Sequence, residues 1–304
     1  MHVFNGVGYE ILRTEEELFD IFYGKHLLHL SSGRLNDIAD VASNKINSKD
    51  KPRYILKTIS DTLTELGYAT SQEEDYDFRS ALIEKKLACR DRVNIFLTIG
   101  GNLNLPLYAV LAPHHAFIRW DNGNERINWE TTVRDENSVT AGKEIYDDSY
   151  VKRFKIMEIS INKGVYLKNL TREEFFAVPW NEWGVRFSNM GKSKESIECY
   201  DRALEFNPTY PDAYTNKAAE LFAGKEVDNE ILLGLYEKAL ELDPLLVTSL
   251  YNKARTLSRL GRIKEAKITV EEAFAAIENR KIYYQDYRKD LEHMKKHIEE
   301  HLGA

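Results

Sequence analysis

Three residues between positions 88 and 132 have side chains suited to thiol-based acyl chemistry: Cys89, His115 and Glu130. Cys89 stands just before an apolar run that predicts a helix ending at Gly100-Gly101. A thiol at the start of a helix faces the positive end of the helix dipole, which favours the nucleophilic thiolate. A histidine can then act as general base, and a carboxylate can orient the imidazole.

Two strand-like runs flank the sequence Asp-Asn-Gly-Asn and predict a β-hairpin. With Asn122 and Gly123 as the two residues of a type I′ loop, His115 lies directly opposite Glu130. The Cβ atoms of directly opposed residues are about 5 Å apart, which lets a carboxylate hold an imidazole. Because side chains alternate along a strand, Asn128 shares the face of this pair. The same alternation favours His115 over the preceding histidine as the working base.

The same stretch resembles a known family. After the cysteine helix come Leu-Pro-Leu-Tyr-Ala-Val-Leu-Ala-Pro, then Pro-x-His-x-Phe-x-Arg, then Asn-x-Glu-Thr-Thr. This order resembles the transglutaminase-like superfamily with its papain-type core, and more narrowly the SirB-type branch. The resemblance implies Cys89 as nucleophile, His115 as general base and Glu130 in the place usually held by Asp. Ala88 stands where such sequences often have Gly, and Arg90-Asp91-Arg92 replaces small residues, so the substrate approach is expected to differ.

The predicted function is cysteine-dependent chemistry on an amide, as a peptidase, an amidase or an acyltransferase that needs no cofactor. The backbone N–H of Cys89 is the first candidate oxyanion donor, and Asn128 is a candidate substitute for Glu130. The alternative is a non-catalytic interaction scaffold with a degenerate domain, in which Cys89 is inert packing. A zinc hydrolase is disfavoured because His26 and His29 have no third ligand nearby.

From Val178 onward the chain repeats with the period of about 34 residues that is typical of tetratricopeptide repeats. The first copy matches the pattern at Trp180, Trp183, Gly184, Phe187, Tyr200, Ala203 and Pro208, with Ser196 in place of the usual Ala. The second copy ends at Pro244 and is expected to hold an insertion over 224–229, and the third covers 247–279. Three copies predict an all-α solenoid whose concave face binds a peptide or protein partner.

The predicted organisation is an α+β domain of papain/transglutaminase type over 1–170, three repeats over 171–280 and a capping helix over 281–304. The capping helix should cover the exposed face of the last repeat. It carries three histidines on one stripe, interpreted as solvated surface: His293, His297 and His301. Cys199, inside a repeat helix, is interpreted as a core residue.

Other helices are expected before Cys89. They are a capped helix starting at Thr14, a helix over 35–46, a helix over 53–66 and a helix over 75–87 that leads into the cysteine. The polar run 133–146 is interpreted as a surface connection rather than a loop bordering the active cleft.

Composition narrows the possible partners and compartments. The 304 residues carry a net charge of −7 and a pI near 5.7, which disfavours nucleic-acid binding. Cys89 and Cys199 are too far apart in sequence to suggest a disulfide framework. No apolar stretch is long enough for a membrane span, and the first residues do not resemble a secretory signal. A reduced, soluble, cytoplasmic protein is therefore expected.

Overall fold

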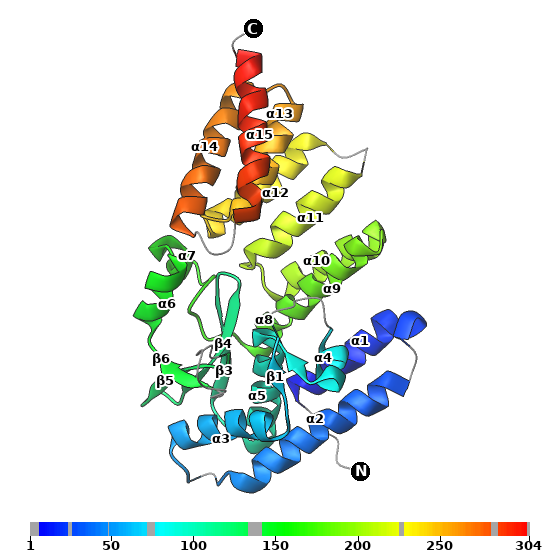
Figure 1. Cartoon of the computed structure of the whole chain (residues 1–304), viewed down its shortest axis with the longest axis vertical. Helices are drawn as coiled ribbons and strands as arrows, with labels where there is room; N and C mark the ends of the chain where they lie inside the picture. The colour runs from blue at the N-terminus through cyan, green and yellow to red at the C-terminus, as the bar shows by residue number, and fades with distance from the viewer. Residues whose placement is uncertain are drawn as a thin grey trace. The chain divides into compact units, whose positions relative to one another are not determined.

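A computed structural model of the chain describes residues 6–23, 26–47, 49–71, 77–132, 142–224, 228–280 and 285–302 (Figure 1). Its contacts divide the chain into two compact units. Unit 1 comprises Met1–Tyr150 with Asn169–Arg172, and unit 2 comprises Val151–Lys168 with Glu173–Ala304. Unit 1 combines helices with small sheets, while unit 2 is helical, which confirms the predicted fold class. Residues 151–168, grouped with the first domain in the sequence prediction, make their contacts within unit 2.

Three long helices open unit 1: α1 (Val7–Tyr23), α2 (His26–Lys45) and α3 (Pro52–Glu65). The prediction that the first helix starts at Thr14 is wrong. Thr14 lies inside α1, where its hydroxyl donates to the Glu10 carbonyl oxygen at 2.9 Å. The earlier start follows from tertiary contacts, because Val7 is buried and the Gly8 N–H donates to Thr98 Oγ1 at 2.8 Å. The second helix also begins earlier than predicted, at His26.

The helix predicted over 75–87 is shorter than expected. In the described residues it is α4 (Phe78–Glu84), which ends because Lys85 takes a left-handed conformation with φ +57°. The chain then forms the short strand β2 (Lys86–Leu87), which pairs in parallel with β1 (Ala69–Thr70). The connection to Cys89 is therefore a strand and not a helix.

Helix α5 (Cys89–Leu103) is the buried helix of unit 1. Side chains on several of its faces are fully buried, including Val93, Ile95, Phe96 and Ile99. The prediction that it ends at Gly100-Gly101 is wrong, since it continues to Leu103 and is closed by Asn104 at φ +52°. Gly100 is required for a close crossing, because a Cβ there would lie 2.9 Å from Leu107 Cδ1.

Four antiparallel strands follow α5 in chain order: β3 (Leu107–Ala112), β4 (His115–Asp121), β5 (Arg126–Glu130) and β6 (Lys143–Ile145). Helix α5 packs against β3 and β4. The Trp129 indole of β5 is buried, and its Nε1 donates to Ser60 Oγ of α3 at 2.9 Å. The sheet is thus tied to two helices that precede it in the sequence, α3 and α5.

The hairpin between β4 and β5 is present, but its predicted register is wrong. Ile118 pairs with Trp129, which makes Gly123 and Asn124 the loop residues. Gly123 has φ +81° and Asn124 does not have positive φ, whereas a type I′ turn needs positive φ at both. The true register differs from the predicted one by two residues. Because two residues is the side-chain period of a strand, every side chain keeps its predicted face.

Three antiparallel helix pairs form the repeats of unit 2: α9 (Ala177–Asn189) with α10 (Ser193–Phe206), α11 (Pro211–Ala223) with α12 (Asn229–Leu242), and α13 (Val247–Arg259) with α14 (Ile263–Asn279). Small residues occupy the crossings within these helix pairs. A Cβ on Gly184 would lie 2.4 Å from the Tyr200 ring. The unusual Ser196 is accommodated because its hydroxyl donates to the Gly184 carbonyl oxygen at 2.8 Å.

Helix α15 (Gln285–Leu302) packs on the third pair and buries Leu291 and Ile298 in the same core as Val270. Short helices precede the repeats: α6 (Asp147–Phe154), α7 (Glu158–Asn162) and α8 (Arg172–Phe175). Cys199 is buried, as predicted. Residues 133–141 and 225–227 lie outside the described residues, as do the side chains of His26 and His301, whereas His29, His293 and His297 are exposed.

Candidate active site

Cys89 is the first residue of α5. Its N-cap, Ala88, is extended, and the Ala88 N–H donates to Asp91 Oδ2 at 2.8 Å. This bond fixes the backbone at the point where the thiol leaves the helix. Cys89 is partly exposed and not in a disulfide. Since the first N–H groups of a helix have no intrahelical acceptor, the Cys89 N–H is suited to bind an oxyanion.

Two of the unusual residues after Cys89, Asp91 and Arg92, are buried in the protein interior. Asp91 and Arg92 are each 3% exposed, and Arg92 Nη2 donates to the Tyr68 carbonyl oxygen at 3.3 Å and to Thr70 Oγ1 at 3.1 Å. Burial raises the pKa of the Asp91 carboxyl to about 6 and lowers the pKa of Arg92 to about 10. These two side chains support the start of α5 from within the domain.

His115 and Glu130 meet, but not as a directly opposed pair. The observed register places Glu130 opposite Phe117, so that His115 is its diagonal neighbour. Diagonal neighbours have Cβ atoms roughly 7–8 Å apart, a gap that a glutamate side chain spans. Glu130 Oε2 lies 2.7 Å from His115 Nε2. The shared face was predicted correctly, while the reason for the contact was not.

The Glu130 carboxylate receives three further hydrogen bonds. Thr132 donates from its N–H at 2.9 Å and from Oγ1 at 2.8 Å to Oε1, and the Tyr150 hydroxyl donates to Oε2 at 3.1 Å. Tyr150 is held by stacking on Phe117, with ring centroids 4.1 Å apart and planes 6° apart. Burial opposes ionisation, yet the hydrogen bond and charge of His115 and the Thr132 donors lower the pKa of Glu130. The carboxylate is thereby fixed and charged.

A side-chain hydrogen bond also links Cys89 to His115. Since Nε2 faces Glu130, Nδ1 is the ring nitrogen left for the sulfur. Burial acts to lower the pKa of His115, but the hydrogen bonds and negative charges of Cys89 and Glu130 raise it to about 10. The structure therefore brings the three predicted residues into one chain of contacts, with a protonated imidazole in the middle near neutral pH.

Asn128 does not take the place predicted for it beside the imidazole. The register sets it opposite Arg119, and its Oδ1 accepts from Arg119 Nε at 2.6 Å. Its Nδ2 donates to Asp147 Oδ1 at 2.8 Å. Both ends of the Asn128 amide are therefore hydrogen-bonded to Arg119 and Asp147 and not to His115. His114 lies in the turn before β4 with φ +54° and is exposed.

Sequence reasoning missed the two residues that hold Glu130. Thr132 belongs to the Asn-x-Glu-Thr-Thr segment, and its closeness to Glu130 was the available signal. Tyr150 comes 20 residues after Glu130 and enters the site from α6. Its side chain is fully buried, but no local pattern in the sequence pairs it with β5.

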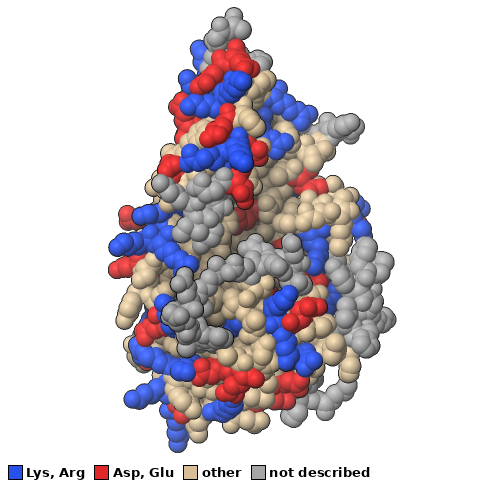
Figure 2. Space-filling view, in the orientation of Figure 1, with Lys and Arg blue, Asp and Glu red and all other residues tan. Residues whose placement is uncertain are grey.

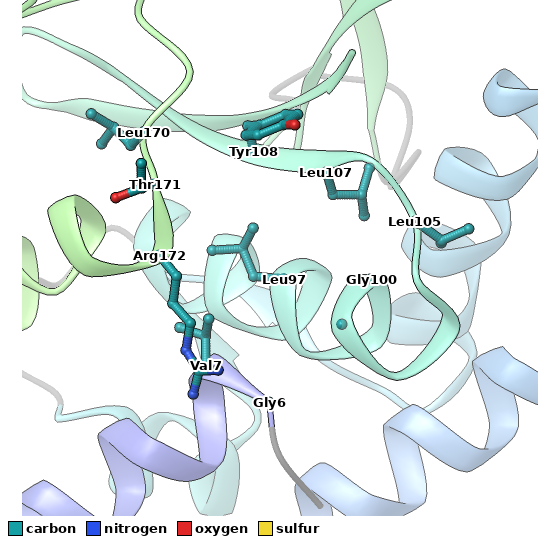
Figure 3. A pocket seen from close by; sticks show the side chains of 11 residues that line it. Gly6, Val7, Leu97, Gly100, Leu105, Leu107, Tyr108, Leu170, Thr171 and Arg172 are labelled. Atoms are coloured by element: carbon teal, nitrogen blue, oxygen red, sulfur yellow. The ribbon is translucent and has the colours of Figure 1, made fainter. Parts of the chain in front are cut away.

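A separate cavity of about 200 Å³ lies at the other end of α5 (Figure 3). Its wall includes Leu97 and Gly100 of α5, Leu107 of β3 and Thr171-Arg172. Gly100 is three helical turns beyond Cys89, roughly 16 Å along the axis. This cavity is therefore distinct from the Cys89 site. Among the residues that the structure describes, no group of three His, Cys, Asp or Glu is arranged to hold a metal ion.

The chain thus has two parts. The α+β domain brings the side chains of a cysteine, a histidine and a glutamate together, and helical repeats follow this domain. A model of the transglutaminase-like superfamily matches residues 31–135, and tetratricopeptide repeat models match 186–222 and 235–268. The chain therefore contains a transglutaminase-like domain followed by tetratricopeptide repeats, which confirms the predicted architecture. The narrower SirB-type assignment stays a prediction.

Two curated relatives match shorter stretches. Protein STIP1 homolog of Dictyostelium discoideum is 31% identical over 91 residues, which are 30% of this chain and 16% of that protein. An uncharacterized protein of Methanocaldococcus jannaschii is 32% identical over 74 residues, which are 24% of this chain and 71% of that protein. The chain thus spans a small part of the first relative and most of the second.

Solved tetratricopeptide domains are also similar. The first repeat domain of Spaghetti (RPAP3), bound to the HSP90 peptide SRMEEVD, has a TM-score of 0.37 and 20% identity over 42% of this chain and 97% of that chain. The TPR2B domain of yeast Sti1, in a complex with pHsp70, has a TM-score of 0.38 and 15% identity over 43% of this chain and 99% of that chain. The repeat assignment itself rests on the family models and the helix pairs of unit 2. In the described part of the chain, no helix is long and apolar enough to cross a membrane.

Proposed function

We propose that the transglutaminase-like domain is a cysteine-dependent enzyme that breaks or exchanges amide bonds. Cys89 is the nucleophile, His115 is the acid–base group and Glu130 orients the imidazole. The observation that supports this assignment is the continuous contact from Cys89 through His115 to Glu130. A packed and inert cysteine needs neither a protonated imidazole beside it nor a carboxylate that is held by three other donors.

The reaction follows from these positions. An imidazolium beside a sulfur favours the thiolate, which attacks the amide carbonyl carbon and forms a C–S bond. The carbonyl electrons move to oxygen, where the Cys89 N–H stabilises the oxyanion. The C–N bond breaks as His115 gives its proton to the leaving amine. Water or a second amine then attacks the thioester, His115 takes the proton of the attacking group, and Cys89 leaves as thiolate.

Glu130 has a positioning role in this scheme. It holds His115 Nε2 so that Nδ1 stays directed at the sulfur, and it stabilises the positive charge on the ring. Tyr150 and Thr132 prevent the carboxylate from rotating away. Replacement of the usual Asp by the longer Glu fits the diagonal geometry, because the carboxylate must cross from one strand pair to the next.

Cysteine labelling tests the proposal, with Cys199 as an internal reference. Burial raises the pKa of Cys199 to about 12, so iodoacetamide at pH 6 should modify Cys89 and leave Cys199 intact. The activated ester p-nitrophenyl acetate should release a burst of p-nitrophenolate and leave an acetyl group on the Cys89 peptide. His115→Ala should slow both reactions. Equal rates in the wild type and the His115→Ala variant would overturn the proposal.

We also infer that the repeats bind a peptide or protein partner on the face formed by α9, α11 and α13. These helices lie next to one another. The face carries exposed Arg255 and Arg259, whose guanidinium groups lie 4.6 Å and 5.3 Å from the Phe222 ring centroid. Peptides selected from a displayed library on the full chain should lose binding when both arginines are replaced by Glu. Unchanged binding would exclude this face.

We infer that the protein acts in a reducing compartment such as the cytoplasm, because the proposed nucleophile is a free thiol.

A further inference from the structure

The segment Val151–Lys168 of unit 2 differs in charge from the rest of the chain. It holds five Lys or Arg residues and one Glu, a net charge of +4 in a chain whose total is −7. Four of the basic side chains are exposed, and in the described residues no carboxylate pairs with them: Lys152, Arg153, Lys155 and Lys163. Figure 2 shows a group of Lys and Arg side chains, with some Asp or Glu side chains beside them, at the left edge, where Figure 1 places α6 and α7.

Two apolar side chains lie exposed among these cations. Met157 is 39% exposed and Ile159 is 42% exposed, whereas Phe154, Ile156 and Val165 of the same segment are buried. We call this surface the α6–α7 patch; it comprises Lys152, Arg153, Lys155, Met157, Ile159 and Lys163. Lys163 Nζ donates to the Glu241 carbonyl oxygen at 2.9 Å, and the patch also holds the exposed Glu158. Isolated exposed apolar residues are common, but a pair beside four cations that have no carboxylate partner among the described residues is suited to recognition.

Buried contacts hold the patch rigidly on the repeats. Phe154 and Ile156 are buried, and the Phe154 carbonyl oxygen accepts from Arg280 Nε at 3.1 Å. Arg280 also forms a bidentate ion pair with Asp243, at 2.6 Å and 2.9 Å, with both side chains at most 1% exposed. The Tyr166 hydroxyl completes the cluster by donating to Asp243 Oδ2 at 2.8 Å.

This anchoring matters for binding. A buried ion pair stabilises a fold only weakly, because desolvation offsets the attraction between the charges. The Arg280–Asp243 pair instead fixes the position of the α6–α7 patch, because Arg280 also binds the carbonyl oxygen of Phe154 at the end of α6. A surface that is already ordered loses little conformational entropy when a partner binds.

We propose that the α6–α7 patch docks an acidic segment of a partner protein in which apolar side chains alternate with Asp or Glu. The cations match the carboxylates, and Met157 with Ile159 match the apolar side chains. A phosphate backbone offers no counterpart for the two apolar residues. A membrane surface requires a larger apolar face with residues such as Trp, Phe or Leu.

Fluorescence anisotropy on the full chain tests the proposal, with a labelled synthetic peptide of alternating Glu and Leu as probe. The double variant Lys152→Glu with Lys155→Glu should weaken binding roughly tenfold, since two attractions become repulsions. Met157→Ser should weaken it less, and added salt should weaken the wild type but not the double variant.

Two further double variants change the net charge by the same amount elsewhere. Lys194→Glu with Lys264→Glu, at exposed positions on α10 and α14, should leave binding unchanged. Arg255→Glu with Arg259→Glu, on the α9–α11–α13 face, asks instead whether the acidic probe binds the repeat face rather than the α6–α7 patch. Circular dichroism should show equal helix content in all variants, and Lys152→Ala with Lys155→Ala replaces the Glu variant if it does not.

Three results would overturn the proposal. Binding could survive in the patch variants, or it could be lost in the Arg255–Arg259 variant instead. Tighter binding to duplex DNA or to phosphatidylserine vesicles than to the peptide would assign the patch to another class of partner.

Discussion

The Cys89 site of unit 1 and the repeat core of unit 2 use buried space in opposite ways. In the repeats, small and apolar side chains such as Gly184, Ala203 and Ala254 pack between helices that are neighbours in sequence. In the site, a buried carboxylate and a nearly buried imidazole are held by hydrogen bonds from several different elements.

Because one region is packed with apolar side chains and the other with hydrogen-bonded polar groups, the two should respond differently to substitutions. Contacts in a repeat array are local and nearly additive, so one substitution is felt mainly in its own pair and the next. A buried polar network is cooperative, because the loss of one member leaves the others without partners in a medium of low dielectric constant. Arg280 with Asp243 is an exception, since it places such a network inside the repeat unit.

The largest expected effect separates the site from the repeats. His115→Ala should lower the rate of Cys89 alkylation at pH 6 by roughly 10²-fold, because a thiol without an imidazolium beside it has a pKa of about 8.5 and is almost wholly protonated at that pH. Mass spectrometry of tryptic peptides over time gives the rate. The thermal transition of the repeats should not move, and a shift of that transition would show that the variant acts through folding.

The second largest effect is expected at the buried Arg280–Asp243 pair of unit 2. Arg280→Met should destabilise unit 2 by about 3–5 kcal/mol, because Asp243 remains charged and buried without its partner. Urea unfolding followed by circular dichroism measures the loss. The double variant Arg280→Met with Asp243→Leu should recover most of the stability. A double variant as unstable as Arg280→Met alone would contradict the explanation.

Tyr150→Phe removes one hydroxyl and keeps the stack on Phe117. A hydrogen bond to a buried charged group contributes about 1.5–3 kcal/mol, so unit 1 should lose stability of that order. Alkylation of Cys89 should slow by less than in His115→Ala. An unchanged rate would show that Thr132 and His115 alone hold Glu130.

The stability of unit 1 should depend on pH through the His115–Glu130 pair. Folding raises the pKa of His115 from 6.5 to about 10, so its contribution is complete below pH 6.5 and is lost as the pH rises through 10. Folding lowers the pKa of Glu130 below 4.5, so its contribution is present above 4.5 and is lost as the pH falls through that lowered value.

Thermal melts of the wild type and of His115→Gln measure this dependence. The stability difference between the two proteins should be greatest between about pH 5 and 6.5 and should shrink towards pH 10. A difference that does not vary with pH would mean that the imidazole is not charged in the folded protein.

The smallest effect is expected in the repeats. Ser196→Ala restores the residue typical of this repeat position and removes one neutral hydrogen bond to the Gly184 carbonyl oxygen. The stability of unit 2 should change by no more than about 1 kcal/mol. A larger loss in urea unfolding would show that this hydroxyl is essential to the crossing of α9 and α10.

The local features of the chain were readable from the order of its residues. The repeat helices, the two hairpin strands and the common face of His115 and Glu130 each follow from a period that recurs within a few tens of residues. The predicted register is wrong by two residues, yet the two side chains keep their common face, because a shift of two residues equals the side-chain period of a strand.

Tertiary structure alone decided which distant groups complete the site and the repeats. Tyr150 reaches Glu130, Asn128 turns to Arg119, and Arg280 with Asp243 draws residues 151–168 into unit 2. None of these contacts has a periodic signature, since each depends on how separately formed elements pack. The physical reason is that periodicity reports the face a residue occupies, whereas the partner on that face is set by the packing of the whole unit.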